Sequence, residues 1–214
     1  MQQTGNRIEL NYLEFHKQWY PLGCFNVQQV YSWCPDFNRH NLRVWESKGY
    51  LIKLRKEYYA FSECRKIPDF NRYLANRIYR PSYISLHTAL SYYGMIPEEV
   101  VQITSVTSLK TASFSNEFGE YTYSSVKSGL MFGYEPKPMA DGRVILLASP
   151  EKALLDLLYL NPFYETEADM SELRLDEDFM FEDFNSEIFK EYAERIGSKA
   201  LNDRVNTLLT VYGL

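Results

Sequence analysis

Residues 39–61 read RHNLRVWESKGYLIKLRKEYYAF and hold the clearest structural signal in the chain. Leu42 and Trp45 are spaced to share one buried face of a helix over residues 39–48. Gly49 follows a basic last turn and is able to adopt the left-handed conformation that ends many helices. The two side chains that could cap the start of this helix are Asp36 and Asn38.

A β-hairpin should follow this helix, and two helices should precede it. Residues 50–55 and 58–61 read as strands, joined by a tight turn at residues 56–57. Upstream, apolar and aromatic residues recur at helical spacing over residues 8–19, and Asn26 is placed to cap a short second helix that ends before Cys34-Pro35. Three helices and a hairpin, in that order, are typical of a winged helix-turn-helix.

The third helix should present a polar face to solvent. With Leu42 and Trp45 buried, 100° per residue places His40, Arg43 and Ser47 on the opposite side, together with Val44. An arginine there can bond guanine through two hydrogen bonds, whereas the flanking and hairpin cations would meet phosphates. The candidate DNA-binding residues are Arg39, His40, Arg43, Ser47, Lys48, Lys53, Arg55 and Lys56. The alternative is a winged helix that serves only as a protein-interaction scaffold.

Charge is distributed unevenly along the 214 residues. The formal net charge is −5, but residues 1–66 carry ten Lys and Arg against six Asp and Glu, whereas the rest carries thirteen against twenty-two. The first part is therefore +4 and the second −9, which fits a polyanion-binding module fused to an acidic body.

The cysteines and the hydropathy indicate the compartment. Cys24, Cys34 and Cys64 are odd in number and form no C-x-x-C pair, so neither a disulfide framework nor a zinc site is indicated. The first residues contain no apolar signal core, and no stretch is apolar enough for a membrane span. We expect a cytoplasmic protein with no membrane contact.

Residues 67–214 should form a larger mixed domain after a short linker at Pro68-Asp69. Helices are predicted at residues 70–79, after the capping residue Ser85, and at residues 150–160, where Ser149 and Pro150 start the helix. Two further helices, at 186–196 and 198–212, close the chain. Strand patterns between them predict an antiparallel sheet, with strands at residues 101–106, 113–118, 121–126, 130–134 and 144–148. The fold class is α+β: an N-terminal winged helix-turn-helix in residues 1–66, then an antiparallel sheet packed with helices.

Residues 165–187 are strongly acidic, with ten Asp and Glu and a single Arg. The favoured interpretation is a solvated loop whose interspersed Phe and Met side chains pack onto the body of the domain. The other interpretation is an acidic patch that mimics DNA or faces a protein partner.

Several longer strings resemble the AbiEi antitoxin family of abortive-infection toxin–antitoxin operons. They are ANRIYRPSYISLHTALSYYGMIPE at 75–98, ITSVT at 103–107 and ASPEKALLD at 148–156, preceded by a winged-helix string at 42–59. The resemblance extends to about Leu160 and weakens in the acidic region and the terminal helices. In many members the wing turn carries a glycine, whereas Lys56 and Glu57 stand there in this chain.

The resemblance implies a transcriptional autorepressor that binds double-stranded operator DNA through its N-terminal domain. It also implies that the C-terminal domain counteracts a nucleotidyltransferase-like toxin encoded next to it. A protein-binding module that neutralises a toxin by direct contact, without binding DNA, is the alternative, and homodimerisation is left open.

Enzyme chemistry has little support in the sequence. The common phosphate-binding motifs are missing, and the three cysteines and three histidines have no recognised catalytic context. Asp69 with Glu135 and Lys137 could be forced into a metal-dependent nuclease pattern, but Pro136 is expected to interrupt the strand that would hold them. We therefore expect no catalytic residue, cofactor or metal.

Overall fold

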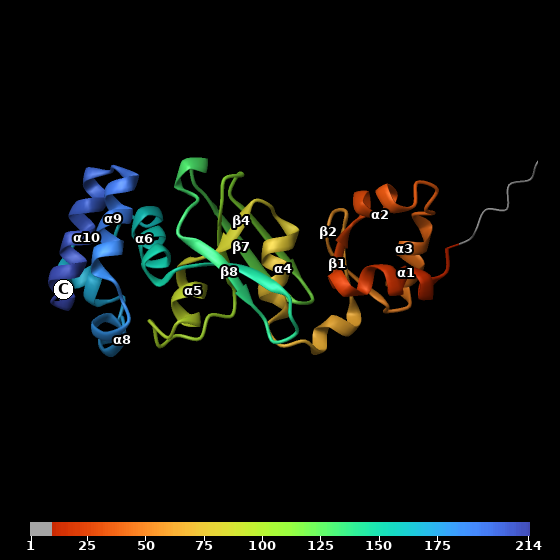
Figure 1. Cartoon of the computed structure of the whole chain (residues 1–214), viewed down its shortest axis with the longest axis horizontal. Helices are drawn as coiled ribbons and strands as arrows, with labels where there is room; N and C mark the ends of the chain where they lie inside the picture. Colours follow the sequence, from red (N-terminus) through yellow and green to blue (C-terminus); the bar gives the residue numbers. More distant parts are fainter. Residues whose placement is uncertain (1–9) are drawn as a thin grey trace, which may run out of the picture. The chain divides into compact units, whose positions relative to one another are not determined.

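The structure is a computed structural model that describes residues 10–214 (Figure 1). The chain divides into two compact units, residues 1–70 (unit 1) and residues 71–214 (unit 2), whereas the sequence analysis placed the boundary between residues 66 and 67. None of the helices in the described chain combines the length and the apolar composition that a bilayer crossing requires.

In its described part, from residue 10 onward, unit 1 contains three α-helices and a small antiparallel sheet (Figure 1). Its helices are α1 (Tyr12–Trp19), α2 (Val27–Trp33) and α3 (His40–Ser47), its strands are β1 (Cys24–Asn26), β2 (Leu51–Arg55) and β3 (Tyr58–Phe61), and its 3-10 segments are η1 (Tyr20–Leu22) and η2 (Ser62–Lys66). The strand order is β1-β3-β2. Strand β1, which is only three residues long, was not predicted, and the predicted start of the first helix at Ile8 lies outside the described residues.

The core of unit 1 is built from aromatic rings around Phe15, which is fully buried. Its ring centroid lies 4.7 Å from that of Trp45 and 5.1 Å from that of Phe25, and the rings of Phe37 and Phe61 are also in contact. A small unit can bury only a few side chains, and large aromatic side chains bury the most apolar surface for each residue that becomes ordered. Helix α3 is anchored here through Trp45.

Unit 2 is a six-stranded sheet packed with helices. Its strands are β4 (Ser82–Ile84), β5 (Ile103–Thr107), β6 (Ala112–Asn116), β7 (Gly119–Ser125), β8 (Tyr134–Pro138) and β9 (Val144–Ala148), and a 3-10 segment, η3 (Ser128–Leu130), precedes β8. The helices are α4 (Phe70–Ile78), α5 (Leu86–Tyr92), α6 (Pro150–Leu160), α7 (Glu167–Ser171), α8 (Glu177–Glu182), α9 (Ser186–Ile196) and α10 (Lys199–Tyr212).

The sheet is mixed, so the prediction of an antiparallel sheet is wrong. The strand order is β6-β7-β5-β4-β9-β8, in which β4 pairs parallel with β9 and β5 pairs parallel with β7. Strand β4 was missed because it has three residues and reads as the approach to a helix. It inserts between β5 and β9, which are separated by β6, β7 and β8 in the sequence, and local patterns contain no information on such pairings.

Helices cover both faces of this sheet. Tyr123 in β7 donates its hydroxyl to the Ala75 carbonyl of α4, at a distance of 2.8 Å. Tyr83 in β4 faces the other side, where its hydroxyl reaches Asp156 of α6. Because side chains alternate along a strand, the two tyrosines mark the opposite faces of one buried sheet.

Strand β8 begins at Tyr134, so the prediction of a strand at residues 130–134 is wrong. Residues 128–130 form η3 instead, and β8 contains both Pro136 and Pro138. The expectation that Pro136 would interrupt a strand is also wrong. Strand β8 is at the edge of the sheet, where the backbone nitrogen of a proline can face outward, so that no hydrogen bond to the neighbouring strand is lost.

The acidic segment is helical, so the prediction of a loop is wrong. Thr166 caps α7 through the Asp169 N–H, and Asp176 caps α8 through the Phe179 N–H at 2.8 Å. Met170, Met180 and Phe184 are buried, as expected of the interspersed apolar side chains, whereas Phe181 is 62 % exposed. The two closing helices, α9 and α10, lie where the sequence predicts them.

Candidate functional site

Helix α3 presents the candidate DNA-binding residues to solvent. Leu42 and Trp45 are 1 % and 6 % exposed, whereas His40, Arg43 and Ser47 on the opposite side are exposed, as the periodicity predicts. Val44 is half-buried between the two faces. A single helix face therefore offers a guanidinium, an imidazole and a hydroxyl, which are side chains able to contact base edges.

Both ends of α3 are fixed by local hydrogen bonds. Neither expected cap is at the cap position, which is Arg39 and makes no side-chain capping bond, but Asn38, one residue earlier, accepts a hydrogen bond from the His40 N–H at 3.0 Å. At the other end Gly49 has a φ of +73°, and the Tyr50 N–H bonds back to the Trp45 carbonyl at 2.9 Å. This is the expected glycine stop, which orients the chain for entry into β2.

Three candidate cations lie in the β2–β3 hairpin, whereas Lys48 is exposed at the C-terminal end of α3. Lys53 and Lys56 are exposed, and the Arg55 guanidinium lies over the ring of Tyr58, 5.3 Å from its centroid. The turn between the strands consists of residues 56–57, as predicted. Without a glycine in the turn, Glu57 itself adopts a φ of +67°.

Glu57 links the hairpin turn to the start of α3. Its carboxylate pairs with the guanidinium of Arg39, and its carbonyl accepts a hydrogen bond from the Val27 N–H at 2.9 Å. The hydrogen bond that the Arg39 guanidinium donates to the Glu57 carboxylate, and the charge of that carboxylate, raise the pKa of Arg39 above its usual value. Arg39, expected to meet phosphate, is therefore paired with an acid in the same unit. No local pattern predicts this pair, because its members are 18 residues apart.

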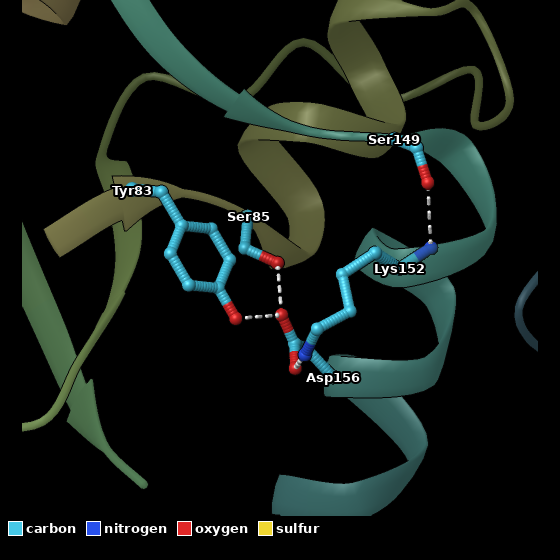
Figure 2. Close-up of polar contacts among 5 residues, drawn as sticks. All are labelled: Tyr83, Ser85, Ser149, Lys152 and Asp156. Atoms are coloured by element: carbon cyan, nitrogen blue, oxygen red, sulfur yellow. Dashed lines mark hydrogen bonds and ion pairs between the residues drawn. The ribbon is translucent and has the colours of Figure 1, made fainter. Parts of the chain in front are cut away.

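A second polar constellation, which the sequence analysis did not identify, lies inside unit 2 (Figure 2). Asp156 of α6 accepts hydrogen bonds on one carboxylate oxygen from the hydroxyls of Tyr83 and Ser85, both at 2.8 Å, and its other oxygen pairs with Lys152. Figure 2 shows Tyr83 and Ser85 reaching Asp156 from the sheet side, while Lys152 approaches along the same helix. Ser149 caps that helix through the Lys152 N–H at 3.2 Å.

This constellation is closed to solvent. Lys152, Tyr83 and Ser85 are 0 % exposed and Asp156 is 1 % exposed. Burial raises the pKa of the Asp156 carboxyl, and Lys152 and the two hydroxyl donors oppose that rise. Burial, and then the neighbouring Asp156, raises the pKa of the Tyr83 hydroxyl.

The geometry of Asp156 and its three partners fits a buried polar network that joins α6 to the sheet better than it fits a reaction centre. A serine nucleophile needs a base that takes its proton and a path for substrate, whereas the Ser85 hydroxyl donates to a carboxylate that already holds Lys152. Ser85 was expected to cap α5, but its side chain makes no capping bond there. The sequence did contain a signal for this pair. Lys152 and Asp156 stand at i and i+4 in the stretch KALLDLL of α6, where all the other residues are apolar.

Two of the residues considered for a metal-dependent nuclease pattern, Glu135 and Lys137, lie on β8. Glu135 pairs with Lys137 of its own strand at 2.6 Å. Across residues 10–214 no three His, Cys, Asp or Glu side chains gather as metal ligands. Comparison with models of known protein families gives no match, and none of the curated proteins matches the chain at a significant level.

Proposed function

We propose that unit 1 is a winged helix-turn-helix that binds double-stranded DNA, with α3 as the recognition helix and the β2–β3 hairpin as the wing. The observation that supports this most directly is the exposure of His40, Arg43 and Ser47 on one face of a helix whose other face is anchored in the core. The formal charge of +4 over residues 1–66 adds the attraction that phosphates require.

The resemblance of residues 42–59, 75–98, 103–107 and 148–156 to AbiEi antitoxins supports a specific biological role. We propose that the protein represses its own operon and that unit 2 counteracts a nucleotidyltransferase-like toxin encoded beside it. The acidic α7–α8 segment exposes Phe181 among carboxylates, and this combination supports the alternative, neutralisation by direct contact with a basic protein surface.

The DNA-binding proposal is tested with a gel shift on the region upstream of the reading frame. We expect retardation at low salt that weakens as salt rises, since each phosphate contact contributes a slope of about −0.9 in log affinity against log salt. A scrambled duplex of equal length is the control for specificity. The absence of retardation of either duplex at low salt would reject the proposal.

The antitoxin role is tested separately, by co-expressing the protein with the toxin from the adjacent gene. A variant that combines Arg43→Ala, Lys53→Ala and Lys56→Ala should lose operator binding and still rescue growth, because these residues belong to unit 1. Loss of rescue in this variant, with the fold intact by circular dichroism, would mean that neutralisation acts through DNA binding.

The Arg39–Glu57 pair leads to a prediction about DNA affinity in general. Glu57→Gln removes one negative charge at the hairpin turn and releases Arg39 for a phosphate, so affinity for every DNA sequence should increase several-fold and the salt dependence should steepen by up to about one phosphate contact. Fluorescence anisotropy with specific and random duplexes measures both quantities.

Glu63→Gln is the matched control because it removes the same charge from an acid paired with His16 of α1. Its effect on DNA affinity should be smaller than that of Glu57→Gln. Equal gains in the two variants would show that only net charge matters, and unchanged affinity in Glu57→Gln would remove Arg39 from the interface.

A further inference from the structure

Two exposed side chains on the outward face of α3 differ in what they can offer to a hydrogen-bonding partner. The guanidinium of Arg43 makes no hydrogen bond or ion pair within residues 10–214. A guanidinium carries N–H donors and no acceptor, so Arg43 can only donate. It therefore suits a base that presents acceptors in the major groove, which is guanine with its O6 and N7.

Ser47 has the opposite polarity because its proton is already used. Its hydroxyl oxygen lies 2.9 Å from the carbonyl oxygen of Val44, within the same helix. A carbonyl oxygen has no proton to give, so the serine hydroxyl is the donor in this bond. Serine often bonds to the backbone of its own helix in this way. The exposed oxygen of Ser47 then offers its lone pairs to solvent, and the residue presents an acceptor.

We propose that Ser47 accepts a hydrogen bond from an exocyclic amino group in the major groove, either N6 of adenine or N4 of cytosine. These amino groups are the donors that base pairs present there. The inference rests on the DNA-binding role proposed for α3. It makes Ser47 a specificity-determining residue, although serine as a residue type can contact either a donor or an acceptor.

The spacing of the two residues places this amino group relative to the guanine. Arg43 and Ser47 are four residues apart, which is about 6 Å along a helix axis. Successive base pairs are about 3.4 Å apart. The amino group should therefore lie within about two base pairs of the guanine. Because every base pair carries one amino group, on its adenine or its cytosine, Ser47 reads which of the two strands holds that base.

The first test compares base preferences of the full chain and its variants. Each protein selects duplexes from a randomised library, and the bound fraction is sequenced. Ser47→Ala should lose the preference at one position within about two base pairs of the guanine that Arg43→Ala ceases to select. Ser47→Thr should keep that preference, since a threonine hydroxyl in a helix can make the same bond to the backbone.

Ser32→Ala is the matched control. Ser32 is an exposed serine of α2 whose hydroxyl donates to the Gln28 carbonyl at 3.0 Å, so it repeats the local chemistry of Ser47 outside the recognition helix. Its replacement should leave the selected sequence unchanged. Circular dichroism verifies that all variants are folded.

The second test removes single groups from the DNA, at the position that Ser47→Ala ceases to select. Purine in place of adenine, or pyrimidin-2-one in place of cytosine, lacks the amino group. This change should weaken binding of the unmodified chain about three- to tenfold more than binding of Ser47→Ala, the difference expected for one neutral hydrogen bond. Weaker base pairing of the analogue affects both proteins alike. A 7-deazapurine, which lacks the N7 acceptor, should not distinguish the two proteins.

Three results would overturn the assignment of Ser47 and leave DNA binding itself in place. They are retardation of DNA without any selected sequence, a selected sequence that Ser47→Ala leaves unchanged, and a difference between the two proteins that follows loss of N7 rather than loss of the amino group. Absence of retardation at low salt would reject both the assignment and the DNA-binding role.

Discussion

Replacing Asp156 with alanine should lower the free energy of unfolding of unit 2 by about 3–5 kcal/mol, because the change leaves a buried ammonium group without its partner. Lys152 is 0 % exposed and cannot reach water without disrupting the packing around it. The hydroxyls of Tyr83 and Ser85 would lose their acceptor at the same time. The measurement is guanidinium denaturation followed by far-UV circular dichroism.

Tryptophan fluorescence locates the damage, because all three tryptophans, Trp19, Trp33 and Trp45, belong to unit 1. A loss that appears in circular dichroism and not in fluorescence assigns the effect to unit 2. The control is Glu187→Ala, which breaks the exposed pair with Lys190 and should cost less than about 1 kcal/mol.

The double variant Lys152→Met/Asp156→Leu distinguishes the loss of a charge partner from the loss of side-chain packing. Replacing both charges with apolar groups of similar size should recover most of the stability, since no unpaired charge remains in the core. If Asp156→Ala were as stable as the unmodified protein, or if the double variant were no more stable than the single one, the stability of unit 2 would not depend on this ion pair.

Replacing Arg43 with alanine should weaken binding to the operator by about 1–3 kcal/mol and leave binding to random DNA less affected. Arg43 is exposed in the centre of the outward face of α3, where its planar fork could bond guanine O6 and N7 together. Competition anisotropy, at one fixed salt concentration, gives the ratio of specific to random affinity in each variant.

Two variants separate base recognition from charge. Arg43→Lys keeps the charge but loses the two-point geometry, so it should lose most of the specificity as well. Lys53→Ala, in the hairpin, should weaken all sequences about equally and reduce the salt slope by about one contact. Equal discrimination by Arg43→Ala and the unmodified protein would remove Arg43 from any role in base recognition.

Many of the helix ends could be predicted from the sequence. Asn26 and Ser149 accept the backbone hydrogen bonds expected of helix caps, and Gly49 has the left-handed conformation expected of a stop, whereas the cap position of α3 is Arg39 rather than Asn38. These features depend on residues within one turn of each other, where a short side chain or a missing Cβ changes the local free energy directly. The acidic segment was mispredicted because its composition dominated the interpretation, although its capping residues were present.

The outward face of α3 is also a local property, since helical periodicity and two buried apolar residues orient His40, Arg43 and Ser47. The pairing of β4 with β9 and the contacts of Arg39 with Glu57 and of Tyr83 with Asp156 are of another kind. In each of them, the free energy depends on groups 18 to 73 residues apart and on their burial, which exist only once the chain has folded. Short-range patterns specify helix ends and the faces of the longer elements, whereas the three-residue strands and the pairing partners are selected by packing.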